Sequence, residues 1–155
     1  MVLGLEAGLS ARGDFRDMTN VTLAESYLLK ALKRLKILEV LRDEQAYSDV
    51  VREAQEIVEL ALKGVLRKVG VEPPRWHDVS DLILEHRDRF PKAVNEKVEE
   101  IARISRWLRK EREFSFYGDI DFIPTEQYSP EDAIRANTDA QFVVGMARLV
   151  IEQAG

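Results

Sequence analysis

Four long amphipathic segments, separated by glycine and proline breaks, restrict this chain more than any other feature. Apolar residues recur at spacings of three and four through each segment, as on the buried face of a helix. The segments begin near Thr22, Ser48, Ala93 and Ser129. Gly70 and Pro73-Pro74 end the second segment, and a shorter helix is expected from Asp78 to about Arg89. The pattern predicts an all-α fold, an antiparallel up-and-down four-helix bundle with an additional short helix.

Capping signals and inward faces refine these helices. Thr22 and Glu25 have the spacing of a capping box, and Ser48 has the residue type of an N-cap. The run Ser129-Pro130-Glu131-Asp132 places an N-cap, a proline and acids at the start of the last helix. Lysine and arginine are expected on the outer face of the first helix. The inward positions expected in the first and last helices are Ala24, Tyr27, Leu28, Ala31, Leu35, Leu38, Leu41, Ala133, Ala136, Ala140, Val143, Val144, Ala147 and Val150.

Two stretches lack a helical period. Residues 1–20 contain three glycines, so we expect an N-terminal arm at 1–20 followed by a single domain at 21–155. The third long helix is expected to end near Arg112. From Glu113 to Tyr128 the chain is rich in aromatic residues, which predicts a loop that packs across the bundle or against a partner.

Composition narrows the classes of function. With a formal net charge of −5, the domain as a whole does not attract nucleic acid, although local basic clusters remain able to bind phosphate. These clusters are Lys30/Lys33/Arg34/Lys36 and Arg103/Arg106/Arg109/Lys110/Arg112. The chain has no cysteine, which excludes disulfides and thiolate metal sites and predicts a cytoplasmic location. No apolar run is long enough to span a bilayer, so no membrane association is expected.

Three patterns, in order along the chain, carry a resemblance to a known family. They are Ala54-Gln55 with Glu59 and Ala61-Leu62-Lys63, then Trp76-His77-Asp78-Val79, then Arg112 with Phe116-Tyr117-Gly118 and Tyr128-Ser129-Pro130-Glu131-Asp132-Ala133. Together they resemble the HEPN family, helical proteins often found beside minimal nucleotidyltransferases in prokaryotes. The resemblance covers Tyr27 to Ile151. It implies a helical bundle that forms a homodimer, with alanine-lined helix faces and the aromatic loop as the expected contacts.

The resemblance also brings a candidate activity. Many catalytic HEPN proteins are metal-independent ribonucleases that use an arginine and a histidine a few residues apart, for phosphate charge and for proton transfer. Arg112 matches the arginine, but no histidine follows it in residues 113–119. Tyr117, with an ordinary pKa near 10, is a poor proton acceptor at neutral pH, and His77 would have to be brought in by the fold. We therefore expect the chain not to be an enzyme. If it is one, the candidate catalytic residues are Arg112, Tyr117 and His77.

A second set of residues is considered for nucleotide or phosphate binding. The candidates are Glu59, Lys63, Arg109, Arg112 and Asp119. Glu59 and Lys63 stand at i,i+4, which fits an exposed salt bridge or, by resemblance, a polar groove near Arg112. The arginines fit either a solvated helix end or a phosphate site. His77 with Asp78 fits a helix cap, no spacing predicts a metal site, and no cofactor is expected.

Three functions stay open at this point. The first is a HEPN subunit without catalysis of its own, associated with nucleotides and paired with a minimal nucleotidyltransferase in a toxin–antitoxin-like system. The second is a divergent metal-independent endoribonuclease centred on Arg112. The third is a helical bundle that binds a nucleotide between its helices. The expected partners are a second copy, a minimal nucleotidyltransferase, and a nucleotide or RNA.

Overall fold

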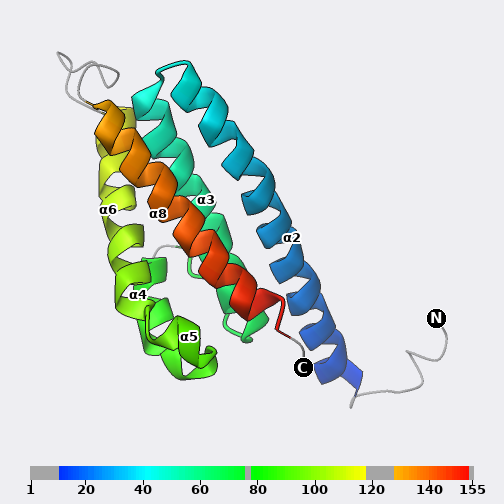
Figure 1. Ribbon diagram of the computed structural model, residues 1–155. Coiled ribbons are helices and arrows are strands. Elements are labelled where there is room, and N and C mark those ends of the chain that lie inside the picture. The colour runs from blue at the N-terminus through cyan, green and yellow to red at the C-terminus, as the bar shows by residue number, and fades with distance from the viewer. Residues whose placement is uncertain (1–10, 76–77, 118–127, 154–155) are drawn as a thin grey trace.

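Four long helices form the body of the molecule, and successive ones run in opposite directions (Figure 1). The computed structural model describes residues 11–75, 78–117 and 128–153, and for residues 11–18 and 112–117 it describes the backbone alone. The long helices are α2 (Ala11–Asp43), α3 (Tyr47–Lys68), α6 (Val98–Tyr117) and α8 (Pro130–Ile151). The short elements between α3 and α6 are α4 (Val79–Glu85), the 3-10 helix η2 (Arg87–Arg89) and α5 (Lys92–Asn95).

This arrangement confirms the predicted all-α bundle of four long helices with an additional short helix. The described residues contain no β-strand. None of the helices in these ranges combines the length and the apolar character that crossing a membrane requires.

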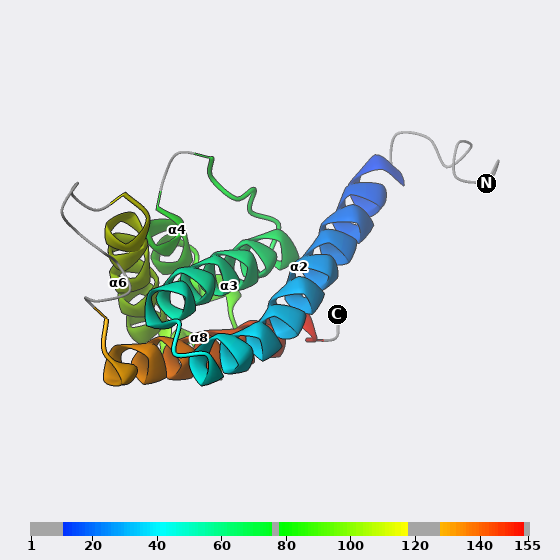
Figure 2. The ribbon, with the colours of Figure 1, turned by 90° about the horizontal axis from the view of Figure 1, so that it is seen from above.

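The first helix is longer than the sequence predicted. α2 begins at Ala11, so the expectation of a loose arm is wrong for residues 11–20, and residues 1–10 lie outside the described ones. Thr22 lies inside α2, so it does not cap the helix with Glu25. Arg67, near the end of α3, donates to Asn20 at 3.5 Å, and the turns before Asn20 extend past the bundle (Figure 2). The division into an arm and a domain stays a prediction.

The start of α3 was misplaced, whereas its end was predicted. Ala46 is the N-cap, and Ser48 lies buried in the first turn. Gly70 has a φ of +80°, which glycine adopts without strain. The Gly70 N–H donates to the Arg67 carbonyl at 3.1 Å and the Val71 N–H to the Leu66 carbonyl at 2.8 Å, so carbonyls at the helix end are satisfied as expected for a glycine stop.

The third long segment also differs from the prediction. Its first turn is the separate helix α5, and Arg87 fixes the bend by binding Asn95 and Glu99. At the other end α6 continues to Tyr117, so the expected end near Arg112 is wrong. The predicted aromatic loop is therefore helical from Glu113 to Tyr117, and residues 118–127 lie outside the described part.

The core lies where α3 packs against α2, α6 and α8. The predicted inward faces are confirmed, except that Tyr27, Leu35 and Leu41 are half-buried. The four alanines expected on the inner face of α8 are at most 1% exposed within one protomer. They are therefore not available to a second copy, which corrects the expectation that alanine-lined faces form the dimer contact.

The outer face of α2 differs from the lysine and arginine surface that was expected. Leu29, Ile37 and Val40 are exposed there beside the lysines. This mixed character was not predicted, because the apolar period of the sequence identifies only the buried stripe.

Candidate functional site

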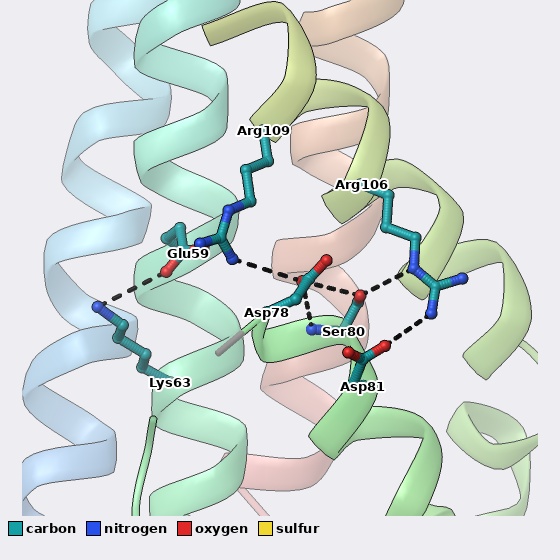
Figure 3. Close-up of polar contacts among 7 residues, drawn as sticks. All are labelled: Glu59, Lys63, Asp78, Ser80, Asp81, Arg106 and Arg109. Carbon is teal, nitrogen blue, oxygen red and sulfur yellow. Dashed lines mark hydrogen bonds and ion pairs between the residues drawn. The ribbon is translucent and has the colours of Figure 1, made fainter. Parts of the chain in front are cut away.

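A polar cluster forms where α3, α4 and α6 meet, and Asp78 lies at its centre (Figure 3). Asp78 is the N-cap of α4, and its Oδ1 accepts the Ser80 N–H at 2.9 Å and the Ser80 hydroxyl at 2.8 Å. This satisfies a backbone donor at the helix start. The cap therefore fixes a carboxylate where Arg109 of α6 can approach it.

Arg106 is the more firmly held arginine of the cluster. Its Nε donates to the hydroxyl of fully buried Ser80 at 3.1 Å, and its second guanidinium nitrogen donates to Asp81 at 2.9 Å. Two directed contacts from one guanidinium resist rotation of the side chain. We conclude that Arg106 serves to hold α4 against α6.

Arg109 is held more loosely. One guanidinium nitrogen lies 3.7 Å from Asp78 Oδ1, which is an ion pair without a close hydrogen bond. The Arg109 side chain is 39% exposed, so it has room to turn toward a ligand. Of these two arginines, Arg109 is the one that an incoming phosphate would recruit at lower cost.

Glu59 and Lys63 extend the cluster onto α3. Their side chains form an ion pair at 3.6 Å, as their i,i+4 spacing predicted. Figure 3 shows Glu59 beside the guanidinium of Arg109, with Lys63 one turn below. Three of the predicted binding residues, Glu59, Lys63 and Arg109, are thus brought together.

The cluster balances its charges. Arg106 faces Asp81, Arg109 faces Asp78 and Lys63 faces Glu59. One turn earlier, Arg103 lies 3.9 Å from Glu100. Three of the five basic residues that the sequence indicated on α6, Arg103, Arg106 and Arg109, are therefore paired with carboxylates, so an anion that binds these three competes with the carboxylates.

The other predicted site residues are only partly described. Arg112 and Tyr117 belong to the last turns of α6, where the backbone alone is described. His77 and Asp119 fall outside the described residues. His86 is the C-cap of α4 and takes no part in the cluster.

A tyrosine anchors the start of α8 to α6. Tyr128 is 7% exposed, and its hydroxyl lies 2.9 Å from Glu111 Oε2 and 3.1 Å from the Glu111 carbonyl. Burial, followed by the hydrogen bond to this carboxylate, raises the pKa of Tyr128. The contact ties the residue before the N-cap of α8 to α6.

Sequence reasoning missed the partners of the cluster. It singled out Asp78 and Arg106 separately, but nothing in the spacing showed that Ser80 and Asp81 would meet Arg106 across 26 and 25 positions. The available signal was Asp78 followed two residues later by serine, a side-chain cap pattern. No group of three or more histidine or carboxylate side chains suited to a metal occurs in the described ranges.

Comparisons with known proteins bear on the whole bundle. The family model described as the HEPN domain matches residues 24–150. Searches among curated proteins and among solved structures found no similar protein.

Proposed function

The chain belongs to the HEPN domain family, and we propose on this premise that it is a non-catalytic subunit that acts with a partner protein. The partner class that we propose is a minimal nucleotidyltransferase, in a pair of the toxin–antitoxin type. The observation that carries this proposal is the charge-balanced cluster of α3, α4 and α6. Its described side chains are arginine, lysine, serine and carboxylates, which suit binding and positioning better than proton transfer near neutral pH.

The cluster suits a nucleotide phosphate in one specific way. Arg109 exchanges the 3.7 Å pair with Asp78 for a bidentate contact to phosphate, while Arg106 keeps its two contacts and holds the helices in place. Lys63 adds a second cation from α3 by leaving Glu59. Nucleotide binding at this site is therefore coupled to breaking weak, exposed ion pairs, which cost little to break.

A second copy of the chain is proposed to dock on the outer face of α8. Ile134 and Leu149 are 51% and 48% exposed on this helix, and the exposed positions between them include Thr138, Gln141 and Gly145. A line of uncharged residues with an exposed aliphatic side chain at each end suits a contact between proteins. This face takes the place of the buried alanine stripe in the dimer that the family resemblance implies.

Co-expression and nucleotide binding test the first proposal together. The chain is expected to co-purify with a minimal nucleotidyltransferase encoded beside its gene. ATP is expected to raise the melting temperature of the complex, since a ligand that binds the folded state stabilises it. Arg109→Gln should abolish the shift, whereas Asp78→Asn should preserve or enlarge it because it keeps the helix cap and releases Arg109. If no complex forms and ATP causes no shift in melting temperature, the proposal is contradicted. If no complex forms but ATP shifts the melting temperature of the isolated chain, a nucleotide-binding bundle is favoured.

One observation favours a second candidate, a divergent metal-independent endoribonuclease. The ion pair between Asp78 and Arg109 ties the residue that follows His77 to the turn of α6 that precedes Arg112. A histidine and an arginine from these two segments are the groups that such a reaction needs. This candidate predicts RNA cleavage in EDTA that is lost in both His77→Ala and Arg112→Ala.

A further inference from the structure

The outer face of α2 combines exposed aliphatic and basic side chains. Leu29, Ile37 and Val40 are 53%, 45% and 61% exposed. The lysines at positions 30, 33 and 36 are exposed between them. Positions 29, 33, 36 and 40 repeat at spacings of four and three, so they form one line along the helix. We name the six residues, Leu29, Lys30, Lys33, Lys36, Ile37 and Val40, the α2 stripe.

The bundle leaves the positive charge of the α2 stripe uncompensated. No acidic residue occurs between Glu25 and Glu39, and among the described residues none of the three lysines forms an ion pair. Arg34, from the same segment, instead reaches α3 and lies 3.5 Å from Glu53 and 2.9 Å from Glu56. Arg34 is thus neutralised by carboxylates of the same chain. The three exposed lysines of the α2 stripe remain available to carboxylates of another molecule.

The chemistry of the α2 stripe selects one kind of occupant. Three lysines favour carboxylates, and the aliphatic side chains favour leucine-like residues at helical spacing. The stripe holds no aromatic side chain on which a nucleic-acid base would stack, which disfavours single-stranded RNA. A second copy docked through the same face would bring both sets of lysines together, and like charges repel.

We propose that the α2 stripe docks an acidic amphipathic helix of a partner protein. The partner places its leucine-like residues against Leu29, Ile37 and Val40, and its carboxylates face the three lysines. This inference rests on the proposed function, because it requires a partner protein. It specifies which surface the partner contacts and the chemistry of that contact. α2 packs on α3 and α8, and α2 and α6 lie at opposite edges of the bundle (Figures 1 and 2). A partner bound there leaves Arg109 accessible.

A designed peptide tests the proposal directly. The probe is a labelled helical peptide of about 20 residues, long enough to fold on contact, with leucines along one face and glutamates beside them. The control probe has lysines in place of the glutamates. Binding to the full chain is followed by fluorescence anisotropy at low and high salt. The acidic probe is expected to bind, more weakly at high salt, and the lysine probe is expected not to bind.

Two double variants locate the contact. Lys33→Glu/Lys36→Glu is expected to weaken binding of the acidic probe by about tenfold or more, from two lost ion pairs and new repulsion. Lys92→Glu/Lys97→Glu makes the same change in net charge on exposed residues near α5 and is expected to leave binding unchanged. Leu29→Ser/Val40→Ser should also weaken binding. All these side chains are exposed, so circular dichroism should show an unchanged fold.

Several results would overturn the proposal. They are an absence of binding by the acidic probe, equal weakening in both charge-reversal variants, and equal binding of the lysine probe. Displacement of the probe by an RNA oligonucleotide that binds the same face more tightly would assign the α2 stripe to nucleic acid. The peptide assay tests the α2 stripe and does not use the nucleotidyltransferase, so an absence of peptide binding would not contradict the proposed function. Conversely, an absence of co-purification would contradict the proposed partner without deciding whether the α2 stripe binds an acidic helix.

Discussion

Gly64 lies at a close approach of α2, α3 and α8. A Cβ placed on it would lie 3.0 Å from Ile151 Cδ1, 3.2 Å from Tyr27 Cβ and 3.3 Å from the Ala24 carbonyl oxygen. The isoleucine end can move, but the other two atoms are backbone or fixed to it. The residue thus permits the packing that the core requires.

Gly64→Ala should lower the free energy of unfolding by about 1 kcal/mol, because overpacking of about 1–3 kcal/mol exceeds a helix-propensity gain near 1 kcal/mol. Gly145→Ala is the matched control. Apart from its own turn of helix, nothing lies within 4 Å of that Cβ in a single copy, so the same change should stabilise the unassociated chain by about 0.5–1 kcal/mol. Urea unfolding of dilute protein measures both. Equal stabilisation by the two substitutions would contradict the close approach.

Tyr128 gives the molecule a predictable response to high pH. Burial and the Glu111 carboxylate raise its pKa above the ordinary value near 10. The folded state therefore holds the proton more tightly than the unfolded state. The stability that results is complete below about pH 10 and is lost as the pH rises above it.

Tyr128→Phe should cost about 1 kcal/mol at neutral pH through the lost hydrogen bond. It should also make the decline of stability above about pH 10 shallower than in the wild type, since the substitution removes this one titratable group and no other. Urea titrations at several pH values compare the two. A parallel decline in both proteins would show that Tyr128 is not protected in the folded state.

At the scale of the element, α4 depends on one capping side chain. Asp78→Ala should destabilise the protein by about 0.5–2 kcal/mol, because it removes the cap and the ion pair with Arg109. Asp78→Asn keeps an equally good cap and loses only an exposed pair, which is worth about 0–1 kcal/mol. Thermal unfolding of both variants measures the difference. Equal losses would mean that the ion pair, rather than the cap, stabilises α4.

An element was predicted correctly where residues close together in the sequence determine where it begins or ends. The cap of α8 was predicted, and the structure has it in full, since Ser129 and Asp132 exchange side-chain and backbone contacts. The extension of α2 to Ala11 was missed because residues 11–20 show no sustained apolar period in the sequence. The last turns of α6 were missed because an aromatic run was taken for a loop.

The candidate site shows the same division. The pair Glu59 and Lys63 follows from spacing within one helix and was predicted. The contacts of Arg106 with Ser80 and Asp81 join segments whose faces meet only after packing, so the sequence held no spacing that revealed them. The ion pairs between arginines of α6 and the start of α4 also form only after packing. The sequence alone therefore left both a phosphate site and a solvated helix end open.

Three surfaces of the molecule are proposed for three separate tasks. The outer face of α8 is proposed for a second copy, the α2 stripe for an acidic partner and the α3–α4–α6 cluster for phosphate. Leu149→Glu should therefore lower the mass measured by sedimentation from dimer to monomer, because a buried unpaired charge is costly. Val40→Glu on α2 should leave the mass unchanged. A dimer that survives Leu149→Glu would place the contact elsewhere.

An RNA cleavage assay distinguishes a chain that acts through partners from one that is itself a catalyst. Purified wild type, His77→Ala and Arg112→Ala would each be incubated in excess with mixed RNA in EDTA, and the products separated by electrophoresis. We expect no cleavage by any of the three proteins. Cleavage by the wild type that disappears in both variants would contradict it and make the chain a ribonuclease that uses Arg112 with His77.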